Sequence, residues 1–148
     1  MNHYVLTFDK IHKSDLMKVG GKGVNLGELS RIEGIQVPHG FCVTTEAYRK
    51  TIENNDELEV LIEKLTKLKS EDREQISQIS KSIRSIIENL EIDRNIYNEI
   101  TEALSIYGID DAYAIRSSAT AEDLPHASFA GQQDTYLNIR GKHEIIRH

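Results

Sequence analysis

The stretch VGGKGVNLGELSRIEG, residues 19–34, joins a glycine cluster around Lys22 to an apolar pattern of helical spacing. Glycines let a backbone approach a ligand closely and let successive N–H groups point the same way. The stretch therefore predicts a glycine-rich loop that runs into a short helix, whose N-terminus favours an anion. Within that helix we expect Val24, Leu29 and Ile32 to face inward, with Gly34 closing it. A flexible turn with a surface lysine is the alternative, because the stretch matches neither the Walker pattern nor the dinucleotide fingerprint.

A second polar stretch, RSSATAED at residues 116–123, follows an apolar strand predicted over residues 112–116. An arginine at a strand end is held firmly, and its planar guanidinium matches a pair of phosphate oxygens. The loop that follows combines small side chains with hydroxyls, which suits a segment covering phosphates. The residues of this predicted loop are Ser117, Ser118, Ala119, Thr120 and Ala121.

Two carboxylates end the same stretch, Glu122 and Asp123. Carboxylates beside phosphates repel them unless a cation such as Mg²⁺ intervenes. Alternatively, the two side chains clamp the loop through backbone N–H bonds, and the residues alone favour that interpretation. Thr135, on a strand predicted over residues 135–139, could reach a ligand or could be solvated.

The alternation of strand and helix patterns predicts an α+β fold. Strands are expected at residues 4–8 and 41–43, and Thr44 is expected to cap a following helix. Residues 51–107 are charged and carry apolar side chains at three-four spacing, which predicts a subdomain of two or three helices. Ser70 and Asp93 are the expected helix starts, and Gly108 is the expected stop.

Composition limits the class of protein. The 148 residues carry a net charge of −6, which argues against a nucleic-acid surface, and the short apolar runs predict no membrane segment. The N-terminus lacks a signal-peptide core, and Cys42 is the single cysteine, which fits a cytoplasmic location. The six histidines lack metal-ligand spacing, so we assign no metal ligand and no catalytic residue.

Three segments together carry a family resemblance: GGKGVNLGEL at 20–29, VPHGFCVTTEAY at 37–48 and AIRSSATAEDLPHASFAGQQDTYLNI at 114–139. They resemble the N-terminal ATP-binding domain of phosphoenolpyruvate synthase and pyruvate phosphate dikinase, and the last resembles the rifampicin phosphotransferase branch most. The resemblance implies that residues 1–148 form the N-terminal lobe of an ATP-grasp fold, a partial ATP-grasp with an inserted helical subdomain at 51–107.

The resemblance also implies roles for residues. Lys22 and Arg116 match the family's phosphate-contacting cations, residues 117–123 match the loop that folds over the phosphates, and Thr135 matches a position near the nucleotide. ATP would give its β-phosphoryl group to a histidine on a swivelling domain, which passes it to pyruvate or a rifamycin hydroxyl, leaving AMP and phosphate.

Most of the Mg²⁺ ligands, the phosphohistidine and the acceptor-binding domain are expected outside these 148 residues, so we expect this chain alone to be inactive or nearly so. Two alternatives stay open: a stand-alone nucleotide- or partner-binding module without catalysis, and a helical interaction protein that works through residues 51–107.

Overall fold

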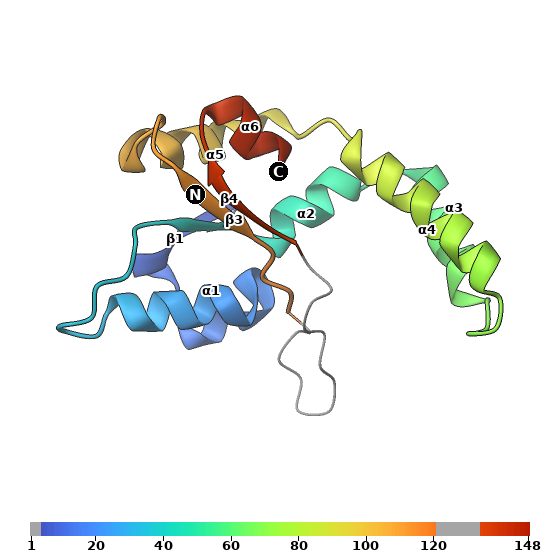
Figure 1. The fold of residues 1–148 in the computed structure, drawn as a ribbon, viewed down its shortest axis with the longest axis horizontal. Helices are drawn as coiled ribbons and strands as arrows, with labels where there is room; N and C mark the ends of the chain where they lie inside the picture. The colour runs from blue at the N-terminus through green and yellow to red at the C-terminus, as the bar shows by residue number, and fades with distance from the viewer. Residues whose placement is uncertain (1–3, 121–133) are drawn as a thin grey trace. The chain divides into compact units, whose positions relative to one another are not determined.

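The computed structural model describes residues 4–120 and 134–148, and its mixture of helices and short strands confirms the predicted α+β class (Figure 1). The chain divides into two compact units. The first unit comprises Met1–Tyr48 with Arg94–His148, and the second unit comprises Arg49–Asp93. Among the helices of the described residues, none combines the length and apolar character that crossing a membrane requires.

The first unit begins with a two-stranded antiparallel sheet. Strand β1 (Val5–Thr7) pairs with β2 (Phe41–Val43), and Leu6 lies opposite Cys42. Two single-turn 3-10 helices, η1 (Phe8–Lys10) and η2 (Lys13–Asp15), follow β1. One cluster of the core forms where they meet the next helix, and its members are Ile11, Val19 and Val24, with Leu6, Phe8 and Cys42 packed against them.

Helix α1 (Leu16–Ser30) corrects the expected glycine loop. The chain is already helical before the glycine cluster, and it departs from helical geometry only at Gly20, where φ is 71° and ψ is 174°. This combination belongs to a region that essentially only glycine occupies. The helix resumes at once, so the predicted loop is a one-residue break and the predicted helix starts at Gly21.

The buried face of α1 also differs from the prediction. Val24 is buried as expected, but Leu29 and Ile32 are 40% and 48% exposed. Gly23 and Gly27 take the inward positions instead, because a Cβ at Gly27 would lie 2.8 Å from Cβ of Ile11. The helix therefore packs through its glycines, which allow a closer approach than large apolar side chains would. It ends at Ser30 rather than at Gly34, whose φ of 85° serves the turn that follows.

A second antiparallel pair completes the strands of the first unit. Strand β3 (Tyr113–Arg116) pairs with β4 (Thr135–Ile139), and Arg116 lies opposite Thr135. The strand predicted at 112–116 begins at Tyr113, and its residues alternate between partly buried and exposed. Strand β4 confirms the strand expected at 135–139.

Helix α5 (Arg94–Tyr107) supplies another part of the core, and α6 (Lys142–Arg147) follows β4. The Glu99 carboxylate on α5 accepts hydrogen bonds from the backbone N–H groups of Tyr4 and Val5, at 3.0 and 3.1 Å. Helix α5 begins directly after Asp93, and Gly108, with φ of 115°, follows its last residue as predicted. The buried face of α5 consists of Ile96, Ile100, Ala103 and Leu104.

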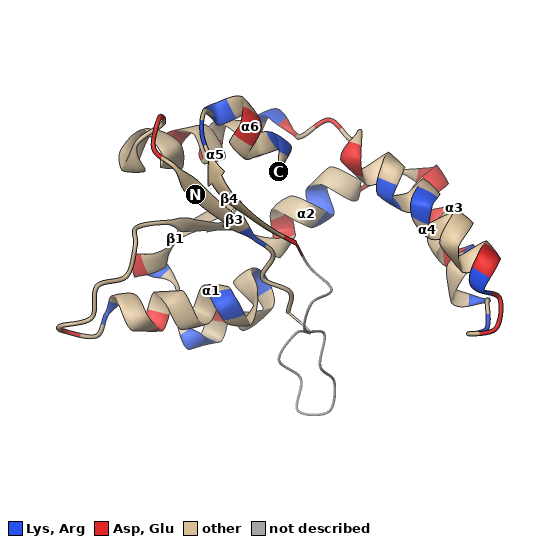
Figure 2. Ribbon diagram, viewed as in Figure 1, with Lys and Arg blue, Asp and Glu red and all other residues tan. Residues whose placement is uncertain are grey.

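The second unit is a pair of neighbouring helices. The chain enters it within α2 (Thr45–Ile52), whose predicted cap is confirmed by a hydrogen bond from Ala47 N–H to Thr44 Oγ1. Helices α3 (Asp56–Thr66) and α4 (Arg73–Glu88) pack together, and Leu58 on α3 is 2% exposed. Both helices carry acidic and basic residues (Figure 2). The α4 start predicted at Ser70 is wrong, because the helix begins at Arg73 after Asp72.

Candidate functional site

The break in α1 lies directly against the segment that follows β3. The backbone N–H of Gly23 donates a hydrogen bond to Oγ of Ser118, 95 residues later, at 2.9 Å. A Cβ built on Gly20 would lie 1.9 Å from the Ser118 carbonyl oxygen and 2.7 Å from its Oγ. Ser118 therefore occupies the space that a side chain at position 20 would need, and this contact brings the two sequence motifs together.

The helical segment after Gly20 presents the features of an anion site. The first N–H groups of a helix have no partner within the helix, and the helix dipole adds partial positive charge there. Gly21, Lys22 and Gly23 form this first turn. Lys22 is partly buried, and its side chain adds positive charge to the same turn.

Arg116 ends β3 beside this turn. Its side chain is exposed, and only Ser117 separates it from Ser118, which places the Cα atoms of Arg116 and Ser118 within ~7 Å of each other. Thr135 lies opposite it on β4. A pocket of about 330 Å³ opens here, with the Tyr136 and His148 rings stacked at 4.5 Å between centroids. The residues lining it are Ile115, Arg116, Ser117, Asp134, Tyr136 and His148.

The structure places six of the nine predicted binding residues. Ser118 contacts Gly20 and Gly23, the glycines on either side of Gly21 and Lys22. Arg116 and Ser117 line the pocket at the end of β3, and Thr135 pairs with Arg116. Thr120 is partly buried and is the last residue described before the gap. Ala121, Glu122 and Asp123 lie outside the described residues. The binding roles of all nine stay predictions.

Cys42 and Asp134 adjoin this region without having been singled out by the sequence. A Cβ on Gly23 would lie 2.9 Å from the Cys42 sulfur, so the thiol packs against the helix turn that holds Lys22. Burial raises the pKa of the Cys42 thiol to about 11. Asp134 lines the Arg116 pocket. No sequence motif marks Cys42 as part of this region, whereas Asp134 could have been noticed because it directly precedes Thr135.

The possible metal ligands among the described residues are not clustered. Within 4–120 and 134–148, the structure shows no group of three His, Cys, Asp or Glu side chains that could hold a metal ion. Phosphate oxygens supply part of a Mg²⁺ shell in nucleotide sites, so a complete set of protein ligands is not needed for Mg²⁺ to arrive with ATP.

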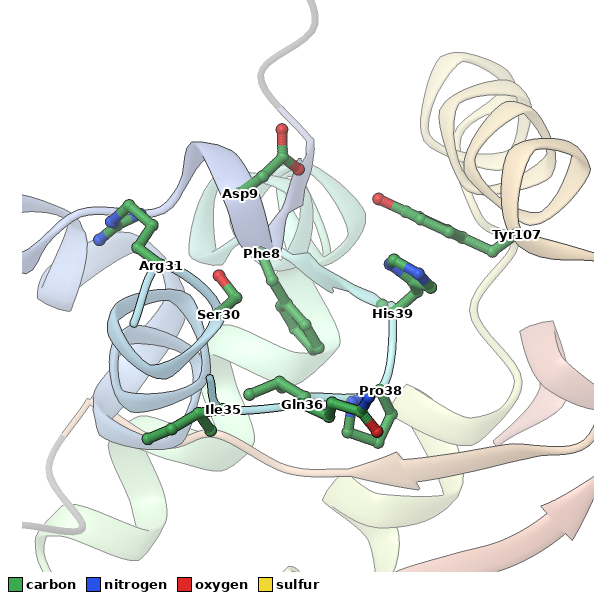
Figure 3. A pocket seen from close by; sticks show the side chains of 11 residues that line it. Phe8, Asp9, Ser30, Arg31, Ile35, Gln36, Pro38, His39 and Tyr107 are labelled. Atoms are coloured by element: carbon green, nitrogen blue, oxygen red, sulfur yellow. The ribbon is translucent and has the colours of Figure 1, made fainter. Parts of the chain in front are cut away.

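A wider hollow of about 950 Å³ lies at the other end of α1. Phe8 and Pro38 line it together with His39 and Tyr107, whose rings are stacked at 5.9 Å (Figure 3). Arg31 lies at its margin and is already engaged, because its guanidinium donates to the Ile11 carbonyl and pairs with Glu28. Ten residues of helix separate Ser30 from Gly20, about 15 Å of rise, so this hollow is distinct from the region around Ser118.

Comparison with known proteins gives a consistent result. The family described as Pyruvate phosphate dikinase, AMP/ATP-binding domain, matches residues 16–148. The chain is 57% identical over 148 residues to a rifampicin phosphotransferase of Bacillus subtilis (strain 168) and 54% identical to one of Bacillus cereus, covering 100% of this chain and 17% of each relative. It is 45% identical over 151 residues to a probable phosphoenolpyruvate synthase of Methanothermobacter thermautotrophicus, covering 99% of this chain and 22% of that protein.

The chain thus spans about one sixth of the length of the two Bacillus relatives. The match runs through α1, the β3–β4 pair and the segment between them, which are the elements that form the region around Ser118. On the strength of this match, the chain belongs to the family of pyruvate phosphate dikinase AMP/ATP-binding domains.

Proposed function

We propose that this chain binds the phosphates of ATP where the break in α1 meets the segment after β3. The observation that carries the proposal is the contact of Ser118 with Gly20 and Gly23, which joins two motifs far apart in sequence at a helix N-terminus. Lys22 and Arg116 supply the positive charge. We assign the cover over the phosphates to Ser117, Ser118, Thr120, Ala121, Glu122 and Asp123, of which the last three lie outside the described residues. Thr135 adds a hydroxyl beside Arg116.

The chemistry of these groups fits a polyphosphate. A helix N-terminus offers N–H donors and partial positive charge, and an exposed guanidinium can bind two phosphate oxygens at once. Mg²⁺ would bind with the nucleotide and neutralise charge on its phosphates. The chain as a whole is acidic, so these local cations, and not a general positive field, would provide the attraction.

We further propose an ATP-grasp architecture, in which this domain is the first of two lobes that enclose ATP. Short antiparallel strands covered by helices are compatible with such a lobe. The reaction we propose for the whole protein transfers the β-phosphoryl group of ATP to a histidine on another domain and then to an acceptor hydroxyl or enol, releasing AMP and phosphate. Its partners are then ATP and the phosphohistidine and acceptor-binding domains of the same protein, and its location is the cytoplasm, where ATP is supplied.

Calorimetric titration with ATP, with and without Mg²⁺, tests the binding proposal. We expect Lys22→Ala and Arg116→Ala each to weaken ATP binding by roughly ten- to hundredfold, the effect of losing a charge-assisted hydrogen bond of ~1.5–3 kcal/mol. Adenosine, which lacks phosphates, should bind equally to the parent chain and to both variants.

Two matched variants serve as controls. Lys67→Ala removes an exposed lysine paired with Glu63 in the second unit, and Arg140→Ala removes an arginine that donates to the Asp110 carbonyl just after β4. Both should bind ATP as the parent chain does. ATP binding that survives both Lys22→Ala and Arg116→Ala would show that the phosphates bind elsewhere.

A further inference from the structure

Ser118 stands in a specific relation to the helical segment that starts after Gly20. In an ordinary helix the N-cap residue lends a side-chain oxygen to the N–H of the second or third helical residue. Here Gly20 occupies the N-cap position of the resumed helix and has no side chain, and the third residue is Gly23. The oxygen bound to the Gly23 N–H comes from Ser118 instead.

The Ser118 hydroxyl lies close to the place that the side chain of an N-cap residue would occupy. The Ser118 Oγ lies 2.7 Å from the point where a Cβ of residue 20 would be, so the hydroxyl sits beside the place of the absent side chain. The Ser118 carbonyl oxygen lies 1.9 Å from the same point, so it would clash with a Cβ at position 20. Ser118, after β3, therefore packs directly against the helix break at Gly20.

We propose that Ser118 is a positioning residue that caps the resumed part of α1 from a distant segment and thereby fixes Lys22 for phosphate binding. Lys22 lies between Gly20 and Gly23, so the cap immobilises the turn that carries it. The inference rests on the proposed ATP function for its consequence, but the cap itself is independent of any ligand.

The arrangement couples two parts of the phosphate site. A serine hydroxyl has acceptor lone pairs and one donor hydrogen, so accepting from Gly23 leaves its hydrogen to be donated to a phosphate oxygen. Lys22 is well placed only while the loop after β3 is docked on the helix. Displacing the loop would then weaken phosphate binding through the helix as well as through the loop.

Amide hydrogen exchange in the ligand-free chain tests the cap. We expect Ser118→Ala to speed exchange at Gly23 by roughly fivefold, the effect of losing a typical N-cap. Ser117→Ala, one residue earlier and exposed, should leave Gly23 unchanged. Unchanged exchange at Gly23 in Ser118→Ala would overturn the proposal, whatever the chain does with ATP.

A double-mutant cycle on ATP affinity tests the positioning role. If Ser118 acts partly through Lys22, Ser118→Ala should weaken ATP binding by roughly fivefold in the parent chain and by clearly less when Lys22 is already alanine, because only the direct hydrogen bond from Ser118 to phosphate is then lost. Equal effects in both backgrounds would mean that Ser118 acts only by direct contact, and the positioning role would fall. Ser30→Ala, which removes a hydroxyl at the opposite end of α1, is the control and should leave the affinity unchanged.

These outcomes separate the two proposals. Failure of the parent chain to bind ATP would sink the proposed function, and with it the consequence for Lys22, while the Gly23 exchange would still decide whether Ser118 caps the helix. If the parent chain binds ATP and the effects of Ser118→Ala and Lys22→Ala are additive, only the positioning role of Ser118 is overturned. The melting temperature of each variant shows that the fold is retained.

Discussion

At the scale of single residues, Gly20 meets two requirements at once. Its backbone adopts a conformation that side chains disfavour, and the space beside its Cα is filled by Ser118. Either requirement alone would favour glycine, and together they leave no room for another residue. Because the same contact joins the two motifs, the identity of this residue controls whether the candidate site forms.

Gly20→Ala should therefore undock the loop after β3 and lower stability by more than 2 kcal/mol, since a disfavoured backbone region costs ~1–3 kcal/mol and the clash adds to it. Urea unfolding measures the loss, and amide exchange at Gly23 reports the undocking. Gly141→Ala is the matched control, because Gly141 has a φ of 82° but no atom within 4 Å of the point where its Cβ would lie. A loss in Gly20→Ala no larger than in Gly141→Ala would show that the clash with Ser118 is not important.

The Cys42 thiol gives a pH-dependent prediction. Burial raises its pKa from 9.0 to about 11, so the thiol form is favoured in the folded chain. Its contribution to stability is fully present below pH 9 and is lost as the pH rises through 11. At pH 8 the thiolate should be roughly a hundredfold scarcer than in the unfolded chain, since two pKa units separate the two states.

A thiol-specific disulfide reagent tests this at pH 8. The folded chain should react far more slowly than the chain in urea, and the folded rate should keep rising with pH beyond 9. The unfolding free energies of the parent chain and Cys42→Ala are compared between pH 8 and pH 11. The difference isolates the contribution of the thiol from that of the other titratable groups. A reaction rate that levels off near pH 9 would contradict the raised pKa.

At the scale of elements, α5 is tied to β1 by one carboxylate. Glu99 accepts the N–H groups of Tyr4 and Val5, which anchor the start of the β1–β2 pair to a helix far along the chain. A two-stranded sheet is marginal by itself, so such a tie matters to its stability. The sheet in turn carries Cys42, which packs against Gly23.

Glu99→Ala should lower stability by roughly 1–3 kcal/mol, because it leaves two N–H groups without their charged acceptor. Exchange at Tyr4 and Val5 should rise most, which amide exchange measured residue by residue would detect. Glu102→Ala is the control, since that side chain is exposed on the same helix. Equal losses in the two variants would mean that the tie contributes nothing beyond helix propensity.

The elements also show what the sequence could and could not predict. The strand at Phe41–Val43, the cap at Thr44 and the stop at Gly108 follow from local rules, and the structure confirms them. The prediction for the inward face of α1 is confirmed at Val24 and wrong at Leu29 and Ile32, because the hydrophobic-stripe rule assumes large apolar side chains, whereas α1 also packs through glycines. The contact of Ser118 with Gly23 joins residues 95 positions apart, and no local pattern encodes such a contact.

At the scale of the whole molecule, the candidate site and the helix pair α3 and α4 belong to different units. Lys22, Arg116, Ser118 and Thr135 all belong to the first unit, and the second unit holds α3 and α4. Each unit has its own buried leucine of comparable burial: Leu104 is 0% exposed in the first and Leu58 is 2% exposed in the second. The same substitution at these two positions therefore compares the contributions of the two units to nucleotide binding.

Leucine-to-alanine changes in a core cost ~2–5 kcal/mol, so both variants should lose stability by similar amounts. If the units are thermodynamically independent, Leu58→Ala should destabilise α3 and α4 while leaving ATP affinity and Gly23 exchange unchanged. Leu104→Ala should speed exchange at Gly23 and weaken ATP binding, because α5 supports β1 and, through β2, the helix turn beside Cys42. Calorimetry and residue-resolved exchange measure both, and a Leu58→Ala variant that binds ATP as poorly as Leu104→Ala would show that the second unit also supports the site.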